Sequence, residues 1–216
     1  MTAELWIVGG SNGAGKTTAV STRELRERLK RVEFLNPDAV TLTKLLARGY
    51  DGFEDPPDDE LRTLFLESAV ETEERMASIL AGGGRCGIET VLSSDKYKPH
   101  VERLNESGGL FFLAYVSVRS ADIAVRRVAG RVKEGGHGVP EEKIRSRFMR
   151  SHELLKWFLP RAAGAYVYDN SDATSPDGPR LVAKIVRGEF VKRDASADIA
   201  PELTAALDAV AAGGPG

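Results

Sequence analysis

The sequence predicts an α/β fold in which a mostly parallel sheet lies between two layers of helices. Short apolar runs alternate with longer segments of helical periodicity along most of the 216 residues. A glycine-rich stretch follows the first apolar run, as expected where a strand passes through a tight loop into a helix. Such alternation favours parallel strands joined by right-handed crossovers, and hence three layers, α/β/α.

The elements are expected in the following order along the chain. Strands are predicted at residues 5–8, 32–35, 85–89, 110–118, 165–168 and 181–191, the last with a turn at Gly188. Helices are predicted at residues 17–31, 38–48, 58–80, 97–107 and 140–158, and another after a cap at Ser120, with Val125, Val128 and Val132 on one face. Residues 1–193 are expected to form one domain. An Ala- and Gly-rich tail, residues 194–216, is expected to hold a short helix at 201–212.

The composition is that of an ordinary globular protein. Hydrophobic residues make up 42%, and 30 Lys plus Arg nearly balance 32 Asp plus Glu, which gives a net charge of -2. A chain so close to neutral lacks a general electrostatic attraction for nucleic acid or anionic membrane. Neither is expected as a partner.

Cysteine content and apolar runs indicate the compartment. The single cysteine, Cys86, cannot form an internal disulfide bond or a cysteine-based metal site. The longest apolar run, residues 110–116, is too short to cross a bilayer. The N-terminus lacks the basic start and apolar stretch of a signal peptide. The expected location is the cytoplasm.

The glycine-rich stretch matches the phosphate-binding pattern G-x-x-x-x-G-K-[ST] in full. Its residues are Gly10, Ser11, Asn12, Gly13, Ala14, Gly15, Lys16 and Thr17, with Thr18 next to them. Glycines let several backbone N–H groups point at one anion. Lys16 is placed to reach the β- and γ-phosphates of a nucleotide, and the Thr17 hydroxyl to bind Mg²⁺. The motif follows a strand and opens a helix, so it predicts a nucleotide site.

Nucleotide binding alone is compatible with a switch, a motor or a kinase. Switches and motors usually carry an apolar strand ending in an Asp that helps to hold Mg²⁺. The sequence has no clear match to that pattern, because Asp169 ends a strand only late in the chain. The chain is also small for a motor. Phosphate transfer to a small molecule is the simplest interpretation.

Such a kinase needs a carboxylate that orients the acceptor hydroxyl and takes its proton. Asp38 follows the second predicted strand. Loops after parallel strands meet at one edge of the sheet, so Asp38 is expected to face Lys16 across a cleft. The alternative is that Asn36 or Asp38 only caps the next helix.

Glu89 and Thr90 end the third predicted strand at the same edge of the sheet. A carboxylate at this place could hold Mg²⁺ through water or bind an acceptor hydroxyl. The alternative is a cap for the following segment. Position in the sequence does not distinguish the two.

Arginines on two predicted helices could stabilise charge on the migrating phosphoryl group. Arg127 and Arg131 are four residues apart and share a helix face, and Arg147 and Arg150 are three apart on the following helix. A glycine-flanked turn containing His137 links the helices. The segment from about 120 to 158 is therefore expected to act as a lid, with His137 as a turn residue within reach of the nucleotide.

Taken together, these residues resemble the zeta-toxin family of P-loop kinases over about residues 4–192. The segments that carry the resemblance are 9–18 (GGSNGAGKTT), 34–38 (FLNPD), 88–93 (IETVLS), 127–140 (RVAGRVKEGGHGVP), 144–155 and 168–171. The phosphate loop is common to many families. The combination of Asn-Pro-Asp, Glu-Thr and Gly-Gly-His-Gly-Val-Pro is much more specific.

The resemblance implies a P-loop NTPase fold of the nucleoside-monophosphate-kinase type, with ATP or GTP as donor and Mg²⁺. It implies that Asp38 is the catalytic base and that Arg131 is the lid arginine on the phosphates. The segment with Glu89, Thr90 and Ser93 would line the acceptor pocket. The characterised toxins phosphorylate UDP-N-acetylglucosamine, and a small helical antitoxin covers their nucleotide site.

This chain departs from the toxins in three respects. It is shorter, and no glycine separates Glu89 from Thr90. The toxins have a second lid arginine just before a Thr-Pro, where this chain has the segment from His137 to Pro140, so Arg147 or Arg150 would have to supply it. Two alternatives to a toxin kinase therefore stay open. One is a metabolite or antibiotic kinase with a different acceptor, and the other is a nucleotide-dependent binding module with no acceptor.

Overall fold

The structure is a computed structural model that describes residues 2–133, 138–172, 175 and 178–213. Within this part of the chain a seven-stranded sheet has the order β2-β3-β1-β4-β5-β6-β7. The strands are β1 (Glu4–Gly9), β2 (Glu33–Leu35), β3 (Arg85–Thr90), β4 (Leu110–Ser117), β5 (Gly164–Asp169), β6 (Arg180–Val186) and β7 (Glu189–Arg193). The first five strands are parallel, whereas β6 and β7 are antiparallel. The predicted mostly parallel sheet is confirmed.

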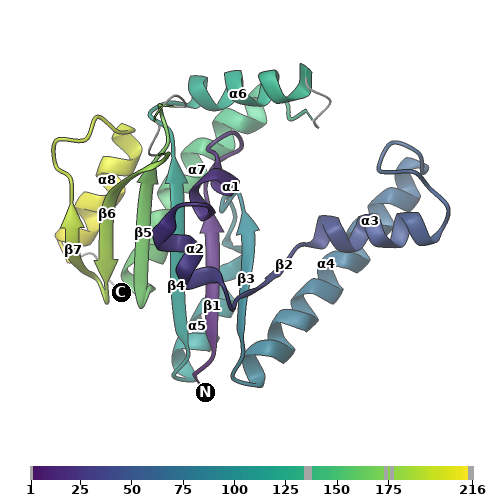
Figure 1. Cartoon of the computed structure of the whole chain (residues 1–216), viewed down its shortest axis with the longest axis horizontal. Helices are drawn as coiled ribbons and strands as arrows, with labels where there is room; N and C mark the ends of the chain where they lie inside the picture. The colour runs from purple at the N-terminus through teal and green to yellow at the C-terminus, as the bar shows by residue number, and fades with distance from the viewer. Residues whose placement is uncertain (1, 134–137, 173–174, 176–177, 214–216) are drawn as a thin grey trace.

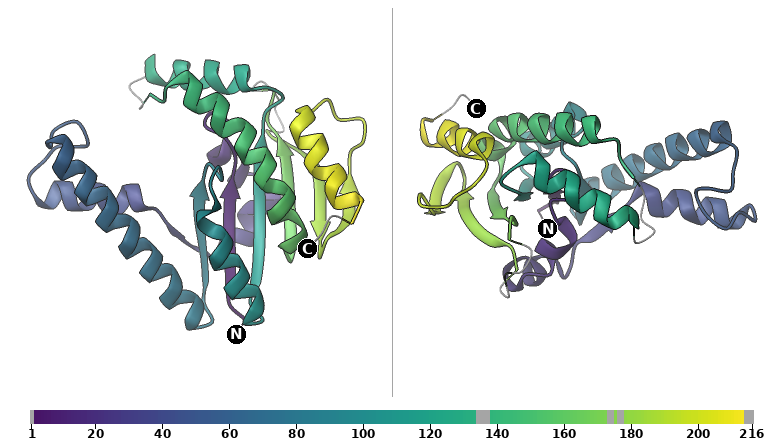
Figure 2. Two further views of the ribbon diagram at one scale, coloured as in Figure 1. Left: turned by 180° about the vertical axis from the view of Figure 1, so that it is seen from behind. Right: turned by 90° about the horizontal axis from the view of Figure 1, so that it is seen from above.

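Helices lie on both faces of the sheet (Figures 1 and 2). They are α1 (Lys16–Val20), α2 (Arg23–Leu29), α3 (Pro37–Ala47), α4 (Asp58–Ala81), α5 (Lys98–Glu106), α6 (Ala121–Lys133), α7 (Glu141–Arg161) and α8 (Pro201–Ala211). A 3-10 turn at Asp95–Tyr97 precedes α5. Among the helices described, none combines the length and apolarity needed to cross a membrane.

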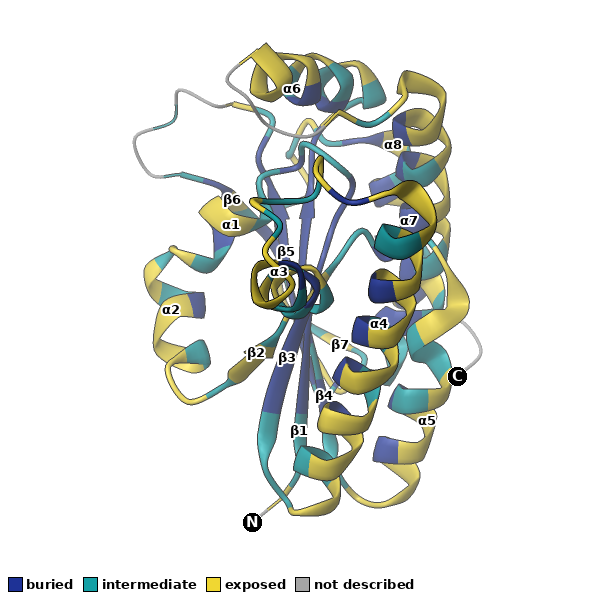
Figure 3. Cartoon of the chain, turned by 90° about the vertical axis from the view of Figure 1, so that its right-hand side faces the viewer, coloured by how far each residue is buried: buried dark blue, intermediate teal, exposed yellow. Residues whose placement is uncertain are grey.

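β1 divides its side chains between two cores, because alternate residues of a strand point to opposite faces. Leu5 and Ile7 belong to the larger core, to which α4, α5, α7 and α8 contribute. Trp6 and Val8 belong to the smaller core, which α1 and α2 cover. Trp6 stacks on Phe112 of β4 with 4.6 Å between ring centroids. Figure 3 shows the central strands buried between helices whose outer surfaces are exposed.

The single helix predicted over residues 17–31 is wrong, because α1 and α2 are separated at Ser21 and Thr22. The Ser21 hydroxyl donates to the carbonyl of Thr17 at 3.3 Å, and the Thr22 hydroxyl to that of Ala19 at 2.7 Å. Hydroxyls that bond to the preceding turn compete with continuation of a helix. Thr22 adopts an extended backbone with ψ of 144° and begins α2.

Two predictions near the C-terminus are confirmed. The turn at Gly188 joins β6 to β7 as a hairpin, with positive φ at both Arg187 and Gly188. The short helix predicted in the tail is α8. Its buried residues Leu203 and Leu207 belong to the larger core, where α8 packs against α7.

α3, α4 and the residues between them, 48–57, extend beside the β2 edge of the sheet and are called the α3–α4 arm (Figures 1 and 2). Ion pairs join its two helices. Lys44 of α3 lies 3.0 Å from Glu71 and 3.6 Å from Glu67 of α4. Arg48 lies 2.8 Å from Glu60. The arm thus carries the residues after β2 away from the sheet and returns them to β3.

Buried polar groups fasten α7 to β4. Tyr115 and Ser151 share a hydrogen bond of 2.9 Å, and Ser117 and His152 share one of 2.8 Å. The carbonyl of Phe148 lies 2.8 Å from His152 Nδ1. A carbonyl can only accept, so Nδ1 donates, and the neutral ring accepts at Nε2 from the Ser117 hydroxyl. Burial lowers the pKa of His152 below its usual value of 6.5.

The stability that neutral His152 supports should be lost in acid. With its pKa lowered in the folded state, the unfolded chain takes up the proton first, so the loss begins as pH falls below about 6.5. We expect the difference in Tm between wild type and His152→Gln to narrow by about 2–4 °C between about pH 7.5 and about pH 5. Thermal unfolding at each pH measures this. A difference independent of pH would contradict the assignment.

Candidate active site

The phosphate loop, residues 10–15, passes between elements that leave no room for a side chain at Gly10, Gly13 or Gly15. Gly13 has φ of +76°, and a Cβ there would lie 2.6 Å from the carbonyl oxygen of Ala124 on α6. Gly15 has φ of +85°, and a Cβ there would collide with the side-chain amide of Asn170. Both backbone conformations favour glycine. The glycines therefore give the loop its shape and its close contact with the surrounding structure.

Side chains from three elements hold the loop in place. Asn170, directly after β5, donates from Nδ2 to the carbonyl of Ala14 at 2.8 Å. Arg127 of α6 donates to the carbonyl of Gly13 at 3.4 Å, and Arg147 of α7 to Oδ1 of Asn12 at the same distance. Two of the predicted arginines thus contact the loop itself. The Asn170 contact is buried, so the loop is held from the end of β5 as well as from α6 and α7.

Lys16 is held over the loop in a partly enclosed position. Its side chain is only 12% exposed and donates to the carbonyl of Gly10 at 3.0 Å. The Glu89 carboxylate lies 3.9 Å from its Nζ. Burial lowers the pKa of Lys16, Glu89 raises it, and Arg131 lowers it further. Arg131 of α6 is therefore close enough for its charge to act on Lys16.

Lys16 and Asp38 line the same cavity, of about 580 Å³, as the sequence predicts. Thr17, Glu89 and Thr90 line it too. The strand ends explain this arrangement, because β2, β3 and β1 are parallel and their following residues gather at one edge of the sheet.

Asn36, rather than Asp38, caps α3. The Asn36 side chain accepts from the backbone N–H of Asp38 at 2.9 Å. The Asp38 carboxylate, in contrast, makes no hydrogen bond or ion pair with the described residues. The capping alternative therefore accounts for Asn36 and leaves the Asp38 carboxylate directed to the cavity.

The residues after β3 form a tight turn at the cavity wall. Thr90 Oγ1 accepts from the backbone N–H of Leu92 at 3.2 Å, and Leu92 is buried with φ of +54°. A positive φ at a leucine stores strain that the surrounding packing has to offset. The turn sets the direction of Glu89 and Thr90. Ser93, also predicted for the acceptor pocket, is not among the residues that line this cavity.

Thr17 and Glu89 offer oxygen ligands of the kind that Mg²⁺ prefers. Within the described ranges, no group of three or more His, Cys, Asp or Glu side chains could hold a metal ion. The two oxygen donors from Thr17 and Glu89 suit Mg²⁺, which is usually held by one or two protein oxygens together with nucleotide phosphates. The residues present therefore fit a nucleotide-bound Mg²⁺ and do not form a separate metal centre.

Not every predicted residue comes to the loop. Arg150 is exposed on α7 and has no contact with the phosphate loop among the residues described. Arg147, one turn earlier, makes that contact instead. Thr18 is exposed on α1 and does not line the cavity. His137 lies outside the described residues.

The role of Asn170 is not predicted from the sequence. One indication was available, because Asn170 follows a predicted strand at the edge of the sheet where ligands bind. The contact itself spans 156 positions, from Asn170 to Ala14, and no local pattern indicates it.

No protein-family model and no curated protein sequence matches this chain. Solved structures do. A complex of AvrRxo1-ORF1 and -ORF2 with ATP matches at a TM-score of 0.63 and 16% identity, over 90% of this chain and 62% of that chain. The fold is that of the P-loop kinases.

Two further structures agree. The PezAT toxin-antitoxin system of Streptococcus pneumoniae matches at a TM-score of 0.55 and 17% identity, over 85% of this chain and 72% of that chain. A candidate kinase of Chloroflexus aurantiacus matches at a TM-score of 0.50 and 24% identity, over 68% of this chain and 76% of that chain. The resemblance to toxin kinases is thus confirmed for the fold. The chain spans 62% of the length of the AvrRxo1 chain.

Loss of the Asn170 amide should loosen the phosphate loop. We expect Asn170→Ala to weaken binding of an ATP analogue about fivefold, since a buried hydrogen bond contributes about 1 kcal/mol. Calorimetric titration measures this. Asn105→Ala is the matched control, because its side chain donates to the carbonyl of Arg161 away from the loop. Equal affinities of the two variants would contradict the proposed role.

Proposed function

We propose that this protein is a Mg²⁺-dependent small-molecule kinase that transfers the γ-phosphate of ATP or GTP to an acceptor hydroxyl, with Asp38 as the base. The observation that carries the proposal is that Lys16 and Asp38 line one cavity. A cation suited to the donor's phosphates and a carboxylate able to take a proton thus face the same space. The ATP complex of AvrRxo1, which shares the fold, supports a nucleoside triphosphate as donor.

The reaction requires the donor to be held and the acceptor to be activated. Backbone N–H groups of the loop and Lys16 bind the β- and γ-phosphates, and Arg127, Arg131 and Arg147 offset charge on the migrating phosphoryl group. Asp38 takes the acceptor's hydroxyl proton as its oxygen bonds to the γ-phosphorus. The bond from that phosphorus to the β–γ bridging oxygen breaks, and the nucleoside diphosphate leaves with the electron pair.

Mg²⁺ would be held by Thr17 and, through water, by Glu89. When bound, it supplies positive charge to the β- and γ-phosphate oxygens. The Glu89 carboxylate, which lies 3.9 Å from Lys16 Nζ, would then interact with the hydrated ion and less strongly with Lys16.

Two classes of acceptor follow from different observations. The resemblance to zeta toxins supports a sugar nucleotide such as UDP-N-acetylglucosamine, a toxin role and an antitoxin partner. The similarity in fold to the PezAT toxin-antitoxin system is in line with such a partner. The second candidate is a metabolite or antibiotic kinase without a toxin role. The acidic lining of a second cavity beside Asp38 favours this candidate.

Replacing the proposed base should separate phosphate transfer from nucleotide binding. We expect Asp38→Asn to lower the transfer rate by about 10²–10⁴-fold with little change in affinity for ATP. A mass-spectrometric screen of sugar nucleotides, polyols and amino sugars for gain of one phosphate identifies the acceptor, and rates are then measured with it.

Two further variants complete this experiment. Asp95→Asn is the control, because its carboxylate is paired with Lys98 outside the cavity. Lys16→Ala should also weaken nucleotide binding. If Asp38→Asn leaves nucleotide hydrolysis unchanged and no acceptor gains phosphate, the protein is a nucleotide-dependent binding module.

Induced expression in a bacterial host tests the toxin role separately. For a toxin kinase, wild-type protein stalls growth and Asp38→Asn restores it, because that substitution removes transfer and keeps the fold. Growth curves of wild type, Asp38→Asn and Asp95→Asn measure the effect. Harmless expression of folded, ATP-binding wild-type protein would contradict the toxin role and leave the metabolic kinase.

A further inference from the structure

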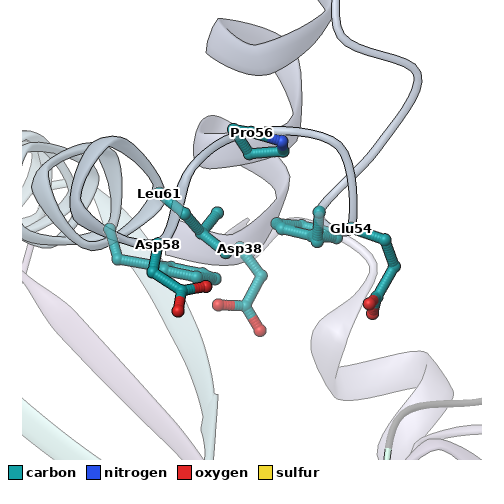
Figure 4. A pocket seen from close by; sticks show the side chains of 7 residues that line it. Asp38, Glu54, Pro56, Asp58 and Leu61 are labelled. Carbon is teal, nitrogen blue, oxygen red and sulfur yellow. The ribbon is translucent and has the colours of Figure 1, made fainter.

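A second cavity, of about 330 Å³, lies at the tip of the α3–α4 arm and shares Asp38 with the nucleotide cavity. Its lining residues are Asp38, Phe53, Glu54, Pro56, Asp58, Leu61 and Phe65 (Figure 4). A molecule in this second cavity would meet the same carboxylate that faces Lys16. The second cavity is therefore placed as the acceptor side of the active site.

The charged lining of the second cavity is entirely acidic. Asp38, Glu54 and Asp58 supply three carboxylates, and the described lining contains no Lys, Arg or His. Figure 4 shows the carboxyl groups of Asp38 and Asp58 directed to the same side of the pocket. Carboxylates grouped in this way repel an anion and attract a cation.

Several acids of the arm are paired with its cations. Lys44 lies within ion-pair distance of Glu67 and Glu71, and Arg48 of Glu60. Among the described residues, Asp38 and Asp58 have no such ion pair, although they lie on the same two helices. Lys44 and Arg48 are thus engaged with other acids, which leaves the carboxylates of Asp38 and Asp58 available to a ligand.

The favourable interaction of a carboxylate with the N-terminus of α4 does not by itself explain why Asp58 faces the second cavity. Asp58 and Asp59 both lie in the first turn of α4, where a negative charge is stabilising. Only Asp58 lines the second cavity. Asp59 therefore serves as an internal reference for the effect of the helix end.

The rest of the lining is apolar and aromatic. Phe53 and Phe65 stack with 5.7 Å between ring centroids and 3° between ring planes, and Pro56 and Leu61 lie beside them. Aromatic faces interact with organic cations and with the C–H faces of cyclic molecules. Carboxylates beside phenylalanines suit a protonated amine on a compact carbon framework.

We propose that the second cavity binds the acceptor and selects a hydroxylated amine, such as an amino sugar or an aminocyclitol with a free ammonium group. This inference rests on the proposed kinase function. The acceptor's hydroxyl lies at Asp38, and its ammonium group lies at Asp58 against the phenylalanines. An acceptor that carries a diphosphate, as a sugar nucleotide does, meets the carboxylates of Asp38 and Asp58 and is rejected.

Binding is measured first, because it does not require turnover. Glucosamine, N-acetylglucosamine and UDP-N-acetylglucosamine are titrated into the complete chain with a non-hydrolysable ATP analogue and Mg²⁺, at a pH at which the amine is protonated. We expect glucosamine to bind at least about tenfold more tightly than its N-acetylated counterpart, with affinity falling as salt rises. Equal or tighter binding of the neutral or anionic sugar, or no binding of any of the three, would overturn the proposal.

Two variants locate the effect. Asp58→Asn should reduce the preference for glucosamine over N-acetylglucosamine to about threefold or less, whereas Asp59→Asn should keep it. Both remove one charge from the same turn of α4, so a general effect on that helix would appear in both. An unchanged preference in Asp58→Asn, or equal losses in the two variants, would also overturn the proposal.

Phosphate transfer then distinguishes this inference from the proposed function. If UDP-N-acetylglucosamine is phosphorylated in an Asp38-dependent manner and the protein shows no preference for amines, the kinase stands and the acceptor class is wrong. If glucosamine binds through Asp58 and no hydroxylated amine ever gains phosphate, the binding site stands and the kinase is wrong. Asp38-dependent phosphorylation of an amino sugar supports both.

Discussion

The active site depends on the close approach of the phosphate loop to the structure around it. Gly13 passes against the backbone of α6, and Gly15 against Asn170 at the end of β5. Asn170 in turn bonds to the carbonyl of Ala14. Because the loop is shaped by contacts from β5 and α6, its backbone N–H groups are oriented before any nucleotide binds. The positions of Lys16 and of the arginines follow from that loop.

The parallel strands determine what faces the loop. β1, β2 and β3 end at one edge, so Lys16, Asp38 and Glu89 come from three crossovers to one cavity. Asn36 caps α3, so the Asp38 carboxylate is not needed as a helix cap. The arm then extends the active site by carrying Asp58 and the two phenylalanines to the far side of Asp38. One carboxylate consequently borders both cavities, the proposed donor and acceptor spaces.

Charge is distributed differently on the two sides of Asp38. The proposed donor side is cationic, with Lys16, Arg127, Arg131 and Arg147 on or near the phosphate loop. The proposed acceptor side carries Asp38 and Asp58, which form no ion pair with the described residues. Such a gradient favours a polyanionic donor at one end and a cationic acceptor at the other, and it disfavours either molecule in the wrong place. Discrimination against misplaced ligands therefore accompanies binding of the correct ones.

The sequence by itself determined the phosphate motif, the alternation of strands and helices, and the presence of Asp38 and Glu89 at the sheet edge. Each depends on local spacing or on the rule that parallel strands end together. Helical periodicity placed Arg147 and Arg150 on one helix but did not show which of them contacts the phosphate loop. It also predicted one helix over residues 17–31, where hydrogen bonds from the Ser21 and Thr22 hydroxyls separate two helices. Only the tertiary structure brought Asn170 to Ala14 and Asp58 to Asp38. These contacts join segments whose separation in sequence carries no periodic signal, because packing between elements decides them.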